Sequence, residues 1–101
     1  MKSARCPVPP LRVRDAHVAA LAALAHPARL RAFFHLVRAA GEVPAGRLAS
    51  ALGVPAPTLS HQLAALHRAG LVSRRRHGRF IQYAAEPGMV RDLVRLLTNC
   101  C

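Results

Sequence analysis

The sequence has few acidic residues and almost no lysine. Its 101 residues contain four Asp and Glu against 15 Lys and Arg, which gives a formal net charge of +11, and Lys2 is the only lysine. Base bias of the genome explains arginine in place of lysine, but it does not explain the shortage of acids. The surplus favours a polyanionic partner, because guanidinium groups form bidentate contacts with phosphate and guanine.

Large aromatic side chains are also scarce. There is no tryptophan, one tyrosine and three phenylalanines, and much of the 52% hydrophobic fraction is alanine. That fraction is high enough for folding, and the length fits one domain with one modest core. Because alanine fills little volume, we expect closely packed helices and a second subunit that completes the buried surface.

Hydrophobic runs are short. No apolar stretch approaches the roughly 20 residues of a membrane span. The first ten residues contain three prolines but no apolar segment typical of a secretory signal. We therefore expect a cytoplasmic protein with no membrane partner. The three cysteines, two of them adjacent, do not indicate a disulfide framework.

Patterns typical of an enzyme are missing as well. We find no Ser/His/Asp set, no paired carboxylates and no phosphate-binding loop, and no cysteine precedes a glycine-rich loop. We therefore expect no catalytic cofactor and no enzyme activity, and a small thiol-dependent enzyme such as an arsenic reductase is the weakest alternative. The six histidines are scattered and none is assigned to a metal; His35, near a predicted core stripe, is expected to be structural.

Four helical segments follow a proline-containing arm at residues 1–14, which we expect to be flexible. Apolar spacing, with Asp, Pro and Gly at the segment ends, predicts the first three helices at about 15–25, 27–40 and 45–52. The fourth is expected to begin after Pro55 or Pro57 and to run to about Ala69. Asp15 is the expected first N-cap, and Gly41 ends the second helix. The apolar face of the first helix and the core stripe of the second are formed by Val18, Leu21, Leu24, Leu30, Phe33, Phe34 and Val37. From the fourth helix we expect inward-facing Leu59, Leu63 and Leu66.

The pattern changes after the fourth helix. Residues 71–76 and 80–84 predict two short strands around a turn at 77–78, and a last helix opens at Pro87. The result is a mostly helical fold with a small β-hairpin, in the α-α-α-α-β-β-α order of a winged helix-turn-helix domain over residues 15–101. The first and last helices have apolar faces that a small domain does not fully use. We expect a homodimer through these two helices; the alternative is that both only cover the monomer core.

The helix-turn-helix and the hairpin carry the predicted DNA contacts. Gly53 permits the turn between the third and fourth helices, so the start of the fourth is expected to face a major groove. The polar residues there are Thr58, Ser60, His61 and Gln62; glutamine can pair with adenine, and serine or threonine can contact either base type. The hairpin residues expected to bind phosphate or a minor groove are Arg74, Arg75, Arg76 and Arg79. An ordinary amphipathic helix and a solvated charge run are the alternatives, but they do not explain why the two features follow one another.

Three segments resemble the ArsR/SmtB family of repressors, over roughly residues 15–98. Residues 24–30 are similar to the start of the family's second helix, 48–63 to its helix-turn-helix, and 69–83 to its wing. Members often have histidine where this sequence has Gln62, a departure that bears on base preference and not on the fold. The resemblance implies a homodimer that represses its own operon by binding palindromic double-stranded operator DNA, and an inducer that lowers its affinity.

The cysteines indicate the inducer. The family's Cys-x-Cys motif near the third helix has no counterpart in residues 41–48, and the last helix lacks the histidines of the family's zinc site. The terminal pair, Cys100 and Cys101, resembles that of arsenite-responsive members. Adjacent thiolates can chelate trivalent arsenic, which takes up to three sulfurs, and Cys6 is the candidate third ligand. Arsenite, an organoarsenical and antimony all stay open as inducers.

Two further interpretations stay open. Adjacent reduced thiols also oxidise readily, which fits a repressor that responds to redox state or to another ligand, although a vicinal disulfide is strained. An architectural DNA-binding protein with no ligand predicts weak sequence preference and no response to thiol reagents.

Overall fold

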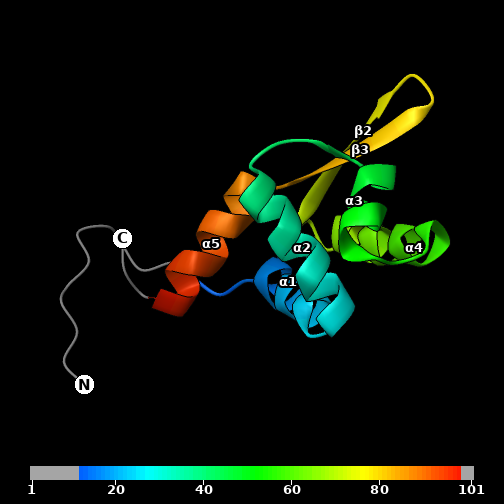
Figure 1. Ribbon diagram of the computed structural model, residues 1–101. Coiled ribbons are helices and arrows are strands. Elements are labelled where there is room, and N and C mark those ends of the chain that lie inside the picture. Colours follow the sequence, from blue (N-terminus) through cyan, green and yellow to red (C-terminus); the bar gives the residue numbers. More distant parts are fainter. Residues whose placement is uncertain (1–11, 99–101) are drawn as a thin grey trace.

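The computed structural model describes residues 12–98 of the chain. In this range it confirms the predicted fold class, since five helices accompany a small antiparallel sheet in winged helix-turn-helix order (Figure 1). In chain order the elements are α1 (Asp15–Leu24), α2 (Pro27–Ala39), β1 (Val43–Pro44), α3 (Ala45–Leu52), α4 (Ala56–Arg68), β2 (Val72–His77), β3 (Phe80–Ala85) and α5 (Pro87–Thr98). Most of the predicted arm lies outside the described residues, and so do Cys6, Cys100 and Cys101.

Glycines end α3 and α4 where the sequence predicts them. Gly70 has a φ of 77°, its N–H donates to the carbonyl of His67, and the N–H of Leu71 donates to the carbonyl of Leu66, both at 3.0 Å. This Schellman arrangement satisfies carbonyls at the end of α4 and turns the chain directly into β2. Gly53, with a φ of 67°, ends α3 and makes the tight turn into α4.

Two predicted helix ends are wrong by one residue. Arg14 is the N-cap of α1, and Asp15 is the first helical residue, where its charge still lies near the positive end of the helix dipole. At the end of α2, Ala40 rather than Gly41 adopts the left-handed conformation, with a φ of 55°. The N–H of Ala40 donates to the carbonyl of Leu36, so the helical hydrogen bonding already stops before Gly41.

The hairpin forms the predicted wing, but the sheet has a third strand. β2 pairs with β3 in antiparallel register along all six residues, and the turn between them begins at Gly78, with a φ of 64°, as two-residue hairpin turns favour. β1 pairs with the other edge of β3 and places Val43 opposite Tyr83, which gives the order β1-β3-β2. In Figure 1 the hairpin projects away from the helices, next to α3 and α4, with α5 on the other side of the domain.

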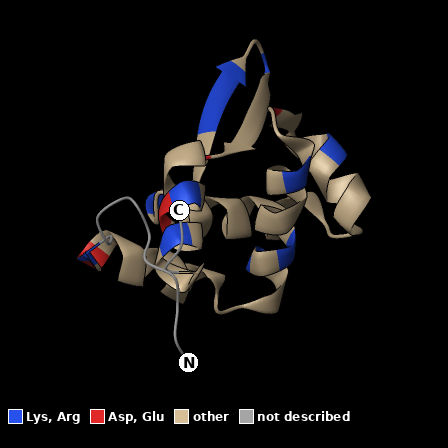
Figure 2. Ribbon diagram, turned by 90° about the vertical axis from the view of Figure 1, so that its left-hand side faces the viewer, with Lys and Arg blue, Asp and Glu red and all other residues tan. Residues whose placement is uncertain are grey.

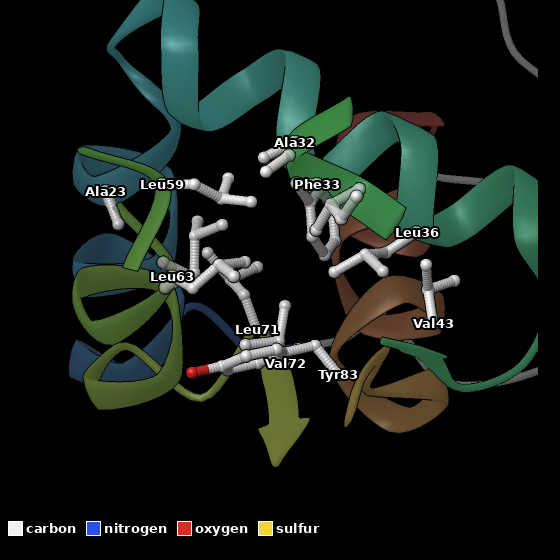
Figure 3. Packing of buried hydrophobic residues seen from close by; sticks show 14 of the residues in the cluster. Ala23, Ala32, Phe33, Leu36, Val43, Leu59, Leu63, Leu71, Val72 and Tyr83 are labelled. Carbon is white, nitrogen blue, oxygen red and sulfur yellow. The ribbon is translucent and has the colours of Figure 1, made fainter. Parts of the chain in front are cut away.

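The core lies between the helices and the base of the wing (Figure 3). Leu36 of α2, Leu63 of α4 and Leu71 before β2 are fully buried, and Tyr83 of β3 packs against the same cluster. The predicted inward face of α4 is confirmed, because its leucines at positions 59, 63 and 66 are all buried. This packing leaves the opposite face of α4 to solvent.

The buried face of α2 differs from the predicted one. Phe33 is buried as expected, but Leu30 and Phe34 are 49% and 57% exposed. Ala32 and Leu36 take their places in the core. The predicted stripe is therefore correct at Phe33 and at the partly buried Val37, but a rotation of the helix moves the other two large apolar side chains to the surface.

The buried face of α1 also differs from the predicted one, although Leu24 packs against the core, partly buried, as expected. Its buried residues are His17, Ala20 and Ala23, whereas Val18 and Leu21 are exposed. Alanines allow α1 to approach its neighbours closely, and the larger apolar side chains are left outside this core. No helix among residues 12–98 is long and apolar enough to cross a membrane.

A buried histidine joins α1 to α5. His17 is fully buried, and its Nδ1 accepts the backbone N–H of Arg14 at 3.0 Å. Its Nε2 lies 3.1 Å from Oδ2 of Asp92, so this nitrogen carries the proton and donates to the carboxylate. The hydrogen bond from His17, with smaller contributions from nearby positive charges, holds the pKa of Asp92 below its ordinary value, although partial burial opposes the shift. Sequence analysis did not single out His17, because this residue lies in an alanine-rich segment and has no second His or Cys three or four positions away.

Candidate nucleic-acid interface

The exposed side of α4 carries most of the predicted base-contacting residues. Thr58, Ser60 and His61 are exposed, within the first two turns of the helix. Gln62 is half-buried, and its Oε1 accepts a hydrogen bond at 3.0 Å from Nε of Arg29 in α2. The structure therefore brings all four predicted residues to one end of α4 and adds Arg29 as a neighbour that the sequence did not reveal.

The wing carries the predicted arginines on both of its faces. Arg74, Arg75 and Arg76 are consecutive on β2, and Arg79 lies in the turn; all four are exposed. Successive side chains of a strand point to opposite faces, so Arg75 faces away from its two neighbours. Figure 2 shows the basic residues running along β2. A hairpin with guanidinium groups on both faces can reach phosphates on either side of it.

One acidic residue is tied to this basic hairpin. Glu42, between α2 and β1, has Oε1 at 3.1 Å from Nε2 of His77 and Oε2 at 3.5 Å from Nε of Arg75. The carboxylate is about one third exposed, and both partners lie on β2. Glu42 thus holds the wing against the loop before β1, in contact with groups that a phosphate would also bind. The only signal for Glu42 in the sequence was the scarcity of acids, since it is one of just four acidic residues in the chain.

Comparisons with known proteins agree with this geometry. A family model described as "Helix-turn-helix domain" matches residues 24–75, about half of the chain. The "Biofilm growth-associated repressor" of Agrobacterium fabrum is 39% identical over 92 residues, which are 90% of this chain and 77% of the relative. A solved structure from Mycobacterium bovis, described as a homodimeric winged helix-turn-helix DNA-binding domain of "a possible ArsR-family transcriptional regulator", has a TM-score of 0.70 at 31% identity and covers 84% of this chain and 80% of its own. The chain belongs to the ArsR family of winged helix-turn-helix transcriptional regulators.

A second solved structure is also similar to this chain. It is described as a "Possible transcriptional regulator for arsenical resistance" and has a TM-score of 0.69 at 31% identity, covering 80% of this chain and 82% of its own.

Curated relatives of this ArsR-family protein are repressors and not enzymes. The chain is accordingly a DNA-binding transcriptional repressor, as the sequence predicts.

The predicted thiol ligands lie outside the described residues. Cys6, Cys100 and Cys101 fall in the stretches 1–11 and 99–101, and α5 is described up to Thr98. Among residues 12–98, no group of three or more His, Cys, Asp and Glu side chains could hold a metal ion.

We expect Glu42→Gln to strengthen DNA binding, by up to about fivefold, because a partly exposed ion pair contributes up to about 1 kcal/mol. The change frees Arg75 and His77 for phosphate. Fluorescence anisotropy with a labelled operator duplex at low salt measures the effect. Glu86→Gln makes the same charge change at the other end of β3 and is the matched control; an equal gain in both variants would show that net charge alone acts.

Proposed function

We propose that this ArsR-family protein is a homodimer that represses transcription from a palindromic operator and leaves it when trivalent arsenic binds its cysteine thiolates. The observation that supports it best is that α4, with its exposed polar end, and the arginine-bearing wing are neighbours in the fold. The turn at Gly70 connects α4 directly to β2, and the two elements are in contact.

The geometry supports a specific mode of DNA binding. The start of α4 enters a major groove, where Thr58, Ser60, His61 and Gln62 contact base edges and phosphates. The wing follows the adjacent backbone or minor groove with Arg74, Arg75, Arg76 and Arg79. Two such units in a dimer place their recognition helices about 34 Å apart, one turn of B-DNA.

Exposed apolar residues on α1 and α5 support the dimer. Val18 and Leu21 on α1 and Val94 and Leu97 on α5 are between 40% and 73% exposed, although the two helices pack against each other. Exposed apolar groups of this size typically mark protein interfaces. The related Mycobacterium bovis domain is described as homodimeric. We therefore place the subunit interface on α1 and α5.

The position of the thiols supports control through α5. Cys100 and Cys101 come two and three residues after the last residue of α5. Trivalent arsenic binds two or three thiolates, and Cys6 of either subunit is the proposed third ligand. Binding can lower DNA affinity only if the inducer favours a state with lower operator affinity. A shift of α5 at the dimer interface would provide such a state, because Glu86 alone separates β3 of the wing from α5.

We expect arsenite to release the reduced protein from its promoter DNA, and Cys100→Ser/Cys101→Ser to abolish this release while leaving DNA affinity unchanged. The thiolates are needed for the metalloid and lie beyond the DNA-contacting elements. Fluorescence anisotropy of a labelled promoter duplex, titrated with arsenite, measures both quantities. Cys6→Ser tests the third ligand, because it weakens the response only if that thiol takes part.

The same titration separates the alternatives. Release by peroxide or diamide but not by arsenite, lost in the double variant, would replace the metalloid with a redox signal. Release by methylated arsenicals or antimony alone would point to a two-thiol site. Sequence-specific binding that no thiol reagent changes would contradict control through the cysteines.

A further inference from the structure

One polar contact links the recognition helix to α2, and the apolar packing of the domain does not require it. Nε of Arg29 donates to Oε1 of Gln62 at 3.0 Å, between residues 33 positions apart in the sequence. α2 and α4 are already held together by buried side chains, among them Phe33, Leu59 and Leu63. Both members of the polar pair are half-buried, so the contact lies at the edge of the core next to solvent.

The chemistry of this contact fixes the orientation of an amide. A guanidinium group has five N–H donors and no acceptor, so the atom of Gln62 that faces Arg29 must be the oxygen. The NH2 group of the same amide then points to the other side. A free glutamine would sample both orientations of this amide, and it would lose that freedom on binding DNA.

Gln62 is also well placed on the helix to reach DNA. It lies four residues after Thr58, which is exposed, and residues at this spacing lie on one side of a helix. Thr58 belongs to the first turn of α4, the part that enters the major groove in the proposed function. Hydrogen-bond acceptors on base edges there include guanine O6 and N7, adenine N7 and thymine O4.

We propose that Arg29 is a positioning residue for sequence recognition: it holds the Gln62 amide with its N–H donors toward the DNA, so that the two residues read one base pair of each operator half-site as a unit. The proposal deepens the operator binding proposed above and rests on it. Arg29 itself need not touch a base. Its loss removes the discrimination at the base pair that Gln62 reads.

The test compares base preferences. Wild type, Arg29→Met, Gln62→Met and the double variant are each used to select binding sites from a randomised duplex library. Their affinities are then measured on the selected site and on its single-base substitutions. Methionine keeps the apolar stem of either residue, and thermal unfolding checks that each variant folds. Arg31→Met removes an exposed arginine two positions along α2 and controls for lost charge.

We expect wild type to discriminate by about 5- to 100-fold at the base pair in question, as a good side-chain contact does. Both single variants lose most of this discrimination at the same base pair, and the double variant loses no more than either. Arg29→Lys restores part of it, because an ammonium group still donates to Oε1 but holds the amide less firmly. Arg31→Met keeps full discrimination. If Arg29 contacted only phosphate, its replacement would lower affinity for all sequences equally, so the loss of such a contact cannot imitate this result.

Three outcomes would overturn the proposal. In the first, Arg29→Met changes no base preference although Gln62→Met does. In the second, the two variants affect different base pairs. In the third, their effects add in the double variant. Each of these leaves operator binding intact and removes only the role of Arg29. If the wild type selects no sequence at all, operator recognition fails, and the role of Arg29 fails with it.

Discussion

Replacing the four wing arginines with glutamine weakens operator binding by about 10³-fold or more at physiological salt, and it makes binding much less sensitive to salt. The residues changed are Arg74, Arg75, Arg76 and Arg79. All four are exposed and lie within one hairpin, so together they form the densest positive charge among the described residues (Figure 2). In a dimer they number eight.

The physical reason is the release of counterions. Each phosphate that an arginine neutralises contributes about 0.9 to the slope of log K against log salt on duplex DNA, so eight contacts contribute about 7. Glutamine keeps a hydrogen-bonding side chain of moderate length but carries no charge. The slope therefore falls by up to about 7 in the variant, and the remaining affinity comes from α4.

The measurement is anisotropy with an operator duplex at several salt concentrations. A matched control replaces four exposed arginines outside α3, α4 and the wing with glutamine: Arg12, Arg31, Arg38 and Arg91. This control has the same net charge as the wing variant. An equal loss of affinity and slope in both proteins would mean that overall charge, and not the wing, holds the DNA.

Leu36→Ala lowers the free energy of unfolding by about 2–5 kcal/mol, whereas Leu30→Ala lowers it by less than about 1 kcal/mol. Both leucines lie on α2, six residues apart, and the substitution is the same. Leu36 is fully buried in the main core, where alanine leaves a cavity, and Leu30 is 49% exposed. A domain of this size has about 5–15 kcal/mol of stability in total, so the first change removes a large share of it.

Urea unfolding at one fixed protein concentration measures both effects, since the proposed dimerisation would make apparent stability depend on concentration. The pair of variants tests the orientation of α2 directly. If Leu30→Ala lowered the free energy of unfolding as much as Leu36→Ala, the result would support the buried face of α2 that was predicted from spacing. It would also mean that Leu30 is covered in the assembled protein.

The fold could be predicted wherever one local signal was enough. The turn glycines at 53 and 70 and the leucine spacing of α4 each act within a few residues, and the structure agrees with them. The alternating hairpin was found in the same way. The stripe of α2 could not be chosen by spacing, because apolar residues occur on more than one side of that helix. Packing against α4 decides in favour of Ala32 and Leu36.

Contacts between distant residues were beyond the reach of the sequence. β1 is two residues long and includes a proline, so it has no periodicity, and it forms only because β3 offers a free edge. The partners of Glu42 and Gln62 come from segments about 30 residues away. Residue type and position along the chain could therefore single out candidate DNA-contacting residues, but not the distant neighbours that contact them.

The hydrogen bond between His17 and Asp92 has a consequence for the order of folding. Its two ends are 75 residues apart, so it closes nearly the whole described chain into a loop. A ribosome makes α1 well before α5, and long-range closures are slow because the chain must lose entropy before they form. Until α5 emerges, the buried imidazole has no carboxylate partner. The packing around the buried imidazole of α1 is therefore completed only when α5 is present, so we expect the first described helix to gain its full stability late in folding.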